Sequence, residues 1–190
     1  MAVIISLLRG VNVGGHHKIK MDELRALYGS LQLRDAQTYI QSGNVVFQTA
    51  ERDLVRLAGR IETAIEKKFG FRPEVINRTC AEMKEVIARN PFAGRREIEP
   101  NKLLVLFLST EPDAEARKAL QRIKTDPEEL RVGGREVYVY YANGMARPVL
   151  PPALIEKTLK TSGTGRNWNS VTKLLEMAEK MEARPATLKP

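Results

Sequence analysis

Apolar residues in the first half of the chain alternate between short unbroken runs and runs spaced at helical intervals. Residues 3–8 form an apolar run without alternation, which is typical of a strand buried on both faces. Two later stretches place apolar side chains at the spacing of one helix face. Ser42-Gly43 separates two strand-like stretches and predicts a hairpin with a two-residue turn. In order, the predicted elements are a strand at 3–8, a helix at 21–31, strands at 37–41 and 44–48, a helix at 54–69 and a strand at 73–76.

This order is the ferredoxin-like βαββαβ unit. The second half repeats the strand–helix–hairpin–helix order, with Asp113 near a helix start, Gly133-Gly134 as the hairpin signal and Pro151-Pro152 opening a helix. A last helix carries its apolar face from Val171 to Met181. The residues themselves show no convincing repeat, so the duplication rests on element order. We therefore predict an α+β fold of two ferredoxin-like βαββαβ subdomains in tandem, with an added C-terminal helix.

The boundary between the two predicted subdomains lies near the middle of the chain. Thr79 and Glu82 match a capping box, which predicts a short helix running to about residue 89. Residues 90–96 then break the helical pattern with proline and glycine. The expected divisions are residues 1–95, residues 96–183 with the C-terminal helix, and a flexible tail at 184–190.

Composition excludes several classes of protein. Of the 190 residues, 43% are hydrophobic and 28% are charged, which is ordinary for a globular domain and argues against disorder or a coiled coil. No apolar run is long enough for a transmembrane helix, and the start lacks the basic region of a secretory signal. A single cysteine, Cys80, fits a reducing compartment, so we expect a cytoplasmic protein.

The chain is basic, with 31 lysines and arginines against 23 acidic residues and a formal charge of +8. A basic surface attracts anions of every kind, including nucleotides and nucleic acids. The excess is shared by both halves, and its densest short stretch is expected between Ile155 and Lys173. An ordinary solvated basic surface explains the same numbers.

A glycine-rich stretch, Arg9 to Gly15, lies between the first predicted strand and the first predicted helix. Loops in that position cradle phosphate when glycines expose backbone N–H groups at a helix N-terminus. Neither the Walker sequence nor G-x-G-x-x-G is present, so the glycines equally permit a tight turn. His16 and His17 are the only histidines and lack the spacing of a metal site, so no metal is expected.

Two further stretches hold polar side chains at predicted turns or helix starts. Residues 38–47 place Ser42 and Asn44 in the hairpin, where turn chemistry alone also explains them. Residues 164–170 hold the only tryptophan, Trp168, beside Arg166. There Asn167 or Asn169 could cap the last helix. Two interpretations stay open: Arg166 holds an anion with Trp168 as a flat apolar wall, or Arg166 pairs with a carboxylate and Trp168 packs between the two halves. Cys80 lies at a helix start, where thiols gain reactivity, although a lone cysteine more often packs as a small hydrophobe.

Nucleic-acid binding is the alternative function. Ferredoxin-like sheets bind RNA through aromatic residues on the first and third strands, where this chain has only Phe47. Tyr138 and Tyr140 share one face of a predicted strand in the second half and could stack on bases, or could pack against neighbouring strands.

Three separated motifs resemble the bacterial Domain of Unknown Function 1697 family. The resemblance spans about residues 3–181 and implies a cytoplasmic α+β protein of two ferredoxin-like subdomains, but no activity. Ser170 and His16-His17 depart from the pattern that the resemblance leads us to expect. The motifs are Leu8 to Gly15, Thr38 to Phe47, and Thr164 to Trp168 continuing through Val171 to Leu174.

We therefore expect a site for an anionic small ligand, such as a nucleotide or a phosphorylated metabolite. The alternatives are an RNA- or DNA-binding protein and a non-catalytic interaction module with an exposed apolar patch. The sequence indicates no cofactor. It also contains no recognisable nucleophile–base pair, so whether the protein is an enzyme stays open. The predicted ligand-binding residues are Arg9, Gly10, Asn12, Gly14, Gly15, Ser42, Asn44, Arg166, Asn167, Trp168 and Lys173.

Overall fold

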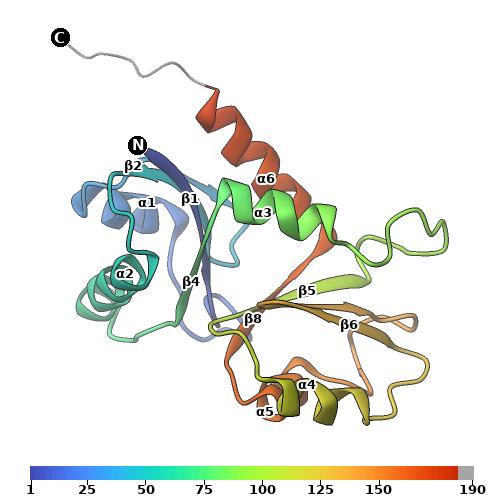
Figure 1. Cartoon of the computed structure of the whole chain (residues 1–190). Coiled ribbons are helices and arrows are strands. Elements are labelled where there is room, and N and C mark those ends of the chain that lie inside the picture. Colours follow the sequence, from blue (N-terminus) through green and yellow to red (C-terminus); the bar gives the residue numbers. More distant parts are fainter. Residues whose placement is uncertain (184–190) are drawn as a thin grey trace. The chain divides into compact units, whose positions relative to one another are not determined.

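Two four-stranded antiparallel sheets form the framework of the protein (Figure 1). The structure is a computed structural model that describes residues 1–183, so the tail predicted at 184–190 lies outside the described residues. The chain divides into two compact units, one of Met1–Lys84 together with the residues from Lys173 onward, and one of Glu85–Thr172. The division therefore differs from the expected boundary at 95/96, and most of the C-terminal helix belongs to the first unit.

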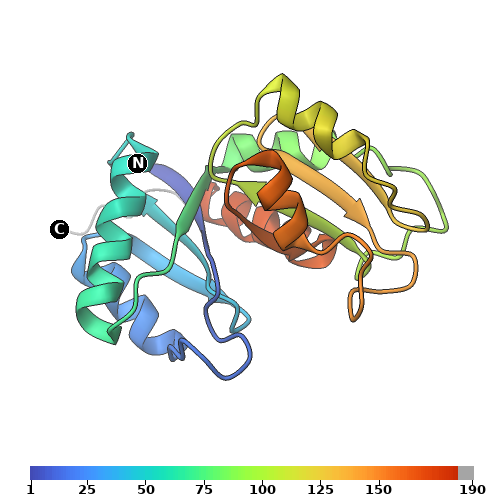
Figure 2. The same ribbon diagram turned by 90° about the horizontal axis from the view of Figure 1, so that it is seen from below.

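The first unit has the predicted ferredoxin-like order. Its sheet runs β2-β3-β1-β4, with β1 antiparallel to both of its neighbours. Helices α1 and α2 lie side by side against this sheet (Figure 2). The elements are β1 (Ala2–Leu8), α1 (Met21–Ser30), β2 (Arg34–Tyr39), β3 (Asn44–Thr49), α2 (Leu54–Phe69), β4 (Val75–Thr79) and α3 (Cys80–Ala88).

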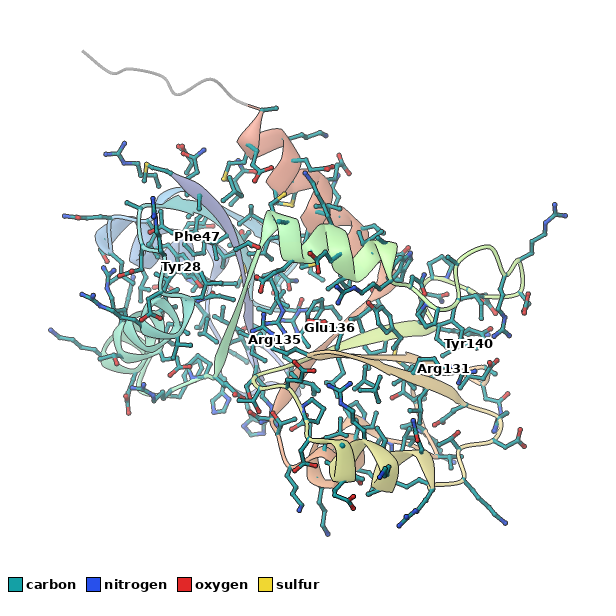
Figure 3. All side chains as sticks on the ribbon, in the orientation of Figure 1. Tyr28, Phe47, Arg131, Arg135, Glu136 and Tyr140 are labelled. Atoms are coloured by element: carbon teal, nitrogen blue, oxygen red, sulfur yellow. The ribbon has the colours of Figure 1, made fainter. Side chains whose placement is uncertain are left out.

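The core of the first unit follows from the alternation of side chains along its strands. Ile4 and Leu8 of β1 point to the side of the helices and pack with buried residues of α1 and α2. Tyr28 of α1 meets Phe47 of β3 edge to face, with ring centroids 5.1 Å apart (Figure 3). Gln48 Nε2 donates to Met181 O at 3.4 Å, which ties the end of the last helix to β3.

The second unit repeats the order, with its sheet running β6-β7-β5-β8. Helices α4 and α5 pack on one face, over a core that includes Leu106, Val137 and Tyr141 (Figure 1). Its elements are β5 (Leu103–Leu108), α4 (Ala114–Gln121), β6 (Glu129–Gly133), β7 (Glu136–Tyr140), α5 (Pro152–Leu159) and β8 (Gly163–Asn167). The chain then enters α6 (Trp168–Glu182), most of which is counted with the first unit. The two βαββαβ units and the C-terminal helix confirm the fold predicted from the sequence.

Two predicted elements of the first unit differ in detail from the structure. The hairpin prediction was wrong in register: Asn44 pairs with Tyr39, so residues 40–43 form a four-residue connection. The Asn44 side chain explains the longer turn, because its Nδ2 donates to Tyr39 O and to Ser42 Oγ at 3.1 and 2.9 Å. The strand predicted at 73–76 begins later, at Val75, and continues to Thr79.

The capping box at the start of α3 is confirmed. Glu82 N donates to Thr79 Oγ1 at 3.1 Å, and Thr79 N donates to Glu82 Oε2 at 2.8 Å. Asn167 rather than Asn169 caps α6, because Ser170 N donates to Asn167 Oδ1 at 2.9 Å. Within residues 1–183, no helix has both the length and the apolar character needed to span a membrane.

Candidate functional site

The glycine-rich stretch after β1 forms a small hairpin of its own. Asn12 N donates to His17 O at 3.2 Å, and a second backbone bond closes the turn between them. Gly14 and Gly15 occupy that turn with φ of 58° and 81°, left-handed values that glycine adopts without the steric cost of a Cβ. The two glycines therefore serve a tight, exposed turn.

Asn12 joins this glycine hairpin to the β2–β3 connection. Its Nδ2 donates to Gln41 O at 2.7 Å and to Ile19 O at 3.0 Å, while its Oδ1 accepts from Ile19 N at 2.9 Å. Asn12 itself has φ of 56°, a conformation that asparagine tolerates better than most residues. Two of the three predicted stretches thus lie together in the first unit.

Gly43 allows the close approach of these two stretches. A Cβ on Gly43, whose φ is 71°, would lie 2.8 Å from Leu8 Cβ and 3.3 Å from Val11 Cβ. Leu8 N also donates to Gly43 O at 2.9 Å. The polar side chains predicted to bind a ligand here, those of Asn12, Ser42 and Asn44, take part in hydrogen bonds that build the loops.

The start of α1 differs from a phosphate-binding helix N-terminus. Residues 16–20 separate Gly15 from the first helical residue, Met21. Lys20 occupies the N-cap without a side-chain bond, and the first turn holds Asp22 and Glu23. Carboxylates in a first turn already satisfy the positive end of the helix dipole, so this helix offers an anion little additional attraction.

The exposed part of the glycine hairpin is basic. Arg9 forms an ion pair with Glu74 at 3.7 Å. The His17 ring stacks on Phe71 with centroids 4.3 Å apart, and its Nδ1 lies 3.2 Å from Gly10 O. Across the described residues, no group of three histidine, cysteine, aspartate or glutamate side chains is arranged to hold a metal ion.

The third predicted stretch belongs to the second unit, where Arg166 of β8 is buried. Its Nη1 donates to Thr164 Oγ1 at 2.7 Å and to Gly165 O at 2.9 Å. Burial lowers the pKa of Arg166 to about 10, because the charged form loses its hydration. Of the cations in the basic stretch between Ile155 and Lys173, Arg166 is therefore buried and does not add to the exposed basic surface.

The residues after Arg166 begin α6. Asn167 caps the helix and Trp168, its first residue, is half-buried. Lys173, counted with the first unit, donates from Nζ to Glu176 Oε2 at 2.9 Å. The sequence predicted Arg9 and Arg166 in one ligand site, and that shared site remains a prediction.

Tyr138 and Tyr140 are not available for base stacking, which corrects one basis of the nucleic-acid alternative. Both are buried, and their hydroxyls donate to Val86 O at 2.7 Å and Glu97 O at 3.0 Å. Tyr141 lies on the opposite face of the sheet, in the core with the valines of β7, as its place in the alternation predicts. The aromatic rings of β7 are therefore core and not a stacking platform.

Cys80 is also unsuited to nucleophilic chemistry. The side chain is buried, and burial together with the hydrogen bond to Glu182 raises the pKa of the thiol to about 11. A thiol with a raised pKa carries little reactive thiolate near neutrality.

A pocket of about 570 Å³ lies elsewhere in the first unit, on the solvent side of α2. Its charged lining consists of four cations and, among the described residues, no carboxylate. The remaining lining comes from Thr63, from Gly59 and Ala64 of α2, and from Leu31, the C-cap residue of α1. The cations are Arg56, Arg60, Lys67 and Arg72.

Neighbouring groups hold three of these cations. Arg72 Nη2 donates to Glu62 Oε2 at 2.9 Å and Nη1 donates to Thr63 Oγ1 at 3.0 Å. Glu66 and Glu62 raise the pKa of Arg72, chiefly because Arg72 donates a hydrogen bond to the Glu66 carboxylate. Arg56 lies 3.7 Å from a Glu51 oxygen.

Arg60 completes this set at the end of α1. Its Nη2 donates to Leu31 O at 3.3 Å, a favourable position for a cation because the C-terminus of a helix is its negative end. No described carboxylate forms an ion pair with Arg60 or with Lys67.

Our sequence reasoning missed this pocket, although the chain contains a signal for it. Arg56, Arg60, Thr63 and Lys67 recur at helical spacing on α2, opposite the apolar stripe that packs in the core. The signal is this polar stripe at helical spacing, which neither glycine content nor local charge density reveals.

Comparison with known proteins places the fold but gives no activity. The solved structure of the conserved bacterial protein SP0830 from Streptococcus pneumoniae is similar, with a TM-score of 0.73 and 21% sequence identity over 93% of this chain and 98% of that chain. At that identity the likeness concerns the fold alone. None of the curated proteins matches the chain. The family described as Protein of unknown function (DUF1697) matches residues 1–138, and this chain belongs to it.

Proposed function

We propose that the protein binds an anionic small ligand, such as a nucleotide or a phosphorylated metabolite. The observation that carries the proposal is the pocket on α2, whose charged lining within residues 1–183 is entirely cationic. The three arginines offer planar guanidinium groups, which suit phosphate and carboxylate oxygens better than a point charge does.

The pocket also offers a surface for the uncharged part of such a ligand. Leu31, Gly59 and Ala64 lie among the cations, and apolar walls beside a few polar groups are typical of small-molecule sites. The Thr63 hydroxyl supplies an additional donor and acceptor. These features support a compact organic anion more than a bare ion.

The residues predicted from the glycine-rich hairpin and the β8–α6 stretch remain a second proposed location. The basic groups around the hairpin, Arg9, His16 and Lys18, are exposed, and none of them lines the α2 pocket. We therefore place the first test at α2.

Isothermal titration calorimetry with inorganic phosphate and with ATP, at low and moderate salt, tests the proposal. We expect saturable binding that weakens, but persists, as salt rises. Arg60→Gln should reduce the affinity about tenfold, since charge-assisted bonds are worth about 1.5–3 kcal/mol. Arg52→Gln is the matched control, because Arg52 lies outside the pocket lining but precedes the same helix.

The outcomes of this titration separate the candidate functions. Binding that responds to Arg60→Gln and not to Arg52→Gln supports the α2 site. Equal losses in both variants indicate general charge attraction and overturn it. Binding of a short oligonucleotide alone, with a steep fall in salt, overturns the small-ligand proposal in favour of nucleic-acid binding.

A further inference from the structure

We infer that the α2 pocket takes a ligand with two anionic groups separated by an uncharged body, as in an organic bisphosphate. This inference rests on the proposed function and names the class of ligand. It comes from the different situations of the four cations and from the open surface between them.

Two of the cations are already neutralised by carboxylates outside the pocket lining. Arg72 has Glu62 and Glu66 as partners at 2.9 and 3.2 Å, and Arg56 has Glu51 at 3.7 Å. These arginines can direct hydrogen bonds to a ligand, but they add little net charge.

The uncompensated positive charge comes from the other two cations, Arg60 and Lys67. Within residues 1–183, neither has a carboxylate partner. They lie seven positions apart on α2, so their backbone positions are separated by about 10 Å along the helix axis and share one face. Two separate charges at this spacing favour two anionic groups over one.

Arg72 reaches Thr63, which lies between Arg60 and Lys67 on α2, and is held in place. Its guanidinium donates to Thr63 Oγ1 at 3.0 Å and to the Glu62 carboxylate. Glu62 is itself fixed, since its Oε1 accepts from Val75 N at 3.0 Å. An immobilised donor loses little conformational entropy when a ligand binds.

The surface beside Arg60 is open at Gly59, which lines the pocket between Arg56 and Arg60. A Cβ on this glycine would meet no atom within 4 Å, so neither the turn nor the packing there requires a glycine. Glycine disfavours the helical conformation, yet Gly59 lies in the interior of α2. Its effect in the pocket is to leave room above the helix backbone for the body of a ligand.

Calorimetry with inorganic phosphate and with linear alkanediol bisphosphates of increasing chain length tests the inference. We expect a best-fitting bisphosphate to bind about 100-fold more tightly than phosphate, because the second group binds at a high effective concentration. Lys67→Gln should remove most of that advantage and leave phosphate binding at Arg60. Lys68→Gln is the control, since Lys68 is the next residue and donates to Glu23 O outside the pocket.

Gly59→Leu provides a second test that keeps every charge. The new side chain occupies the open surface and raises helix propensity, so a loss of bisphosphate binding cannot be attributed to unfolding. We expect at least a tenfold loss for the bisphosphate.

The failures of the two proposals are distinguishable. If phosphate and bisphosphates both fail to bind, the proposed function is wrong. If phosphate binds and every bisphosphate gains no more than about twofold, the two-anion inference is overturned while the anion site stands. Equal affinities of Lys67→Gln and Lys68→Gln for the bisphosphate also overturn it.

Discussion

The first and second units close the end of their first strands in the same way. Leu8 N donates to Gly43 O at 2.9 Å in the first unit, and Leu108 N donates to Arg135 O at 2.8 Å in the second. Each acceptor directly precedes the third strand of its unit. Topology and backbone bonding therefore repeat even where the residues differ.

The fourth strand leads directly into a helix in both units. Thr79 ends β4 and caps α3, while Asn167 ends β8 and caps α6. Each cap accepts a hydrogen bond from the residue three positions later. The element that we predicted as an added C-terminal helix thus has a counterpart in α3.

The units differ in the length of the helix before the fourth strand. Helix α2 has 16 residues, whereas α5 has 8. The cationic pocket spans Arg56 to Lys67, a longer stretch than the whole of α5. The two units share a framework that provides stability. The proposed ligand site lies on α2, the helix that is longer in the first unit than its counterpart α5 in the second.

Core substitutions test the shared framework and should have the largest effect. Phe47→Ala removes a fully buried ring that contacts Tyr28, and we expect it to lower the free energy of unfolding by about 3–5 kcal/mol. Leu106→Ala in the second unit should cost about 2–5 kcal/mol. Urea denaturation followed by circular dichroism measures both. A cost below about 1 kcal/mol in either variant contradicts the packing described for that unit.

Glycines in the turns before β3 and β7 distinguish the two units, and substituting them should have the next largest effect on stability. Gly43 and Gly134 both have left-handed φ, of 71° and 65°, but only Gly43 would place a Cβ against Leu8 and Val11. Gly43→Ala combines overpacking with backbone strain and should cost about 2–4 kcal/mol. Gly134→Ala meets no atom within 4 Å and should cost about 1 kcal/mol. Equal costs in urea denaturation would break the distinction between the two turns.

The sequence predicted the shared framework well because the elements of that framework are periodic. The apolar run of β1 and the capping box of α3 appear in the structure where they were expected. β8 was missed, because Gly163 and Gly165 leave no apolar alternation. Their missing Cβ atoms would lie 2.9 Å from Phe107 O and 3.0 Å from Leu104 Cδ1, so close packing requires glycine there.

The candidate site was harder to predict because it depends on tertiary contacts. The convergence of the glycine-rich stretch with residues 40–43 depends on hydrogen bonds of Asn12, which sequence spacing does not reveal. The burial of Tyr138 and Tyr140 depends on distant backbone acceptors. The α2 pocket needed Leu31 and Arg72 brought beside the helix, although its basic stripe was present in the sequence.

Asn12 tests the side-chain link between the glycine hairpin and the β2–β3 connection of the first unit. Asn12→Ala removes the hydrogen bonds to Gln41 O, Ile19 O and Ile19 N, and should cost about 1–3 kcal/mol. The amide of Ile19 should then exchange with solvent faster, since its acceptor is lost. Asn12→Asp keeps that acceptor and loses only the donors, so protection of Ile19 should largely survive. Unchanged exchange in Asn12→Ala contradicts the role given to this side chain.

The two helix caps should show the smallest effects and the closest agreement between the units. Thr79→Ala and Asn167→Ala each remove one capping bond and should each lower the free energy of unfolding by about 1 kcal/mol. Asn169→Ala is the control, because Asn169 is exposed and its side chain caps nothing among residues 1–183. Urea denaturation of the three variants measures the difference. If Asn169→Ala costs as much as Asn167→Ala, the cap assignment in α6 is wrong and the parallel with α3 fails, since that parallel depends on an equivalent cap directly after the fourth strand.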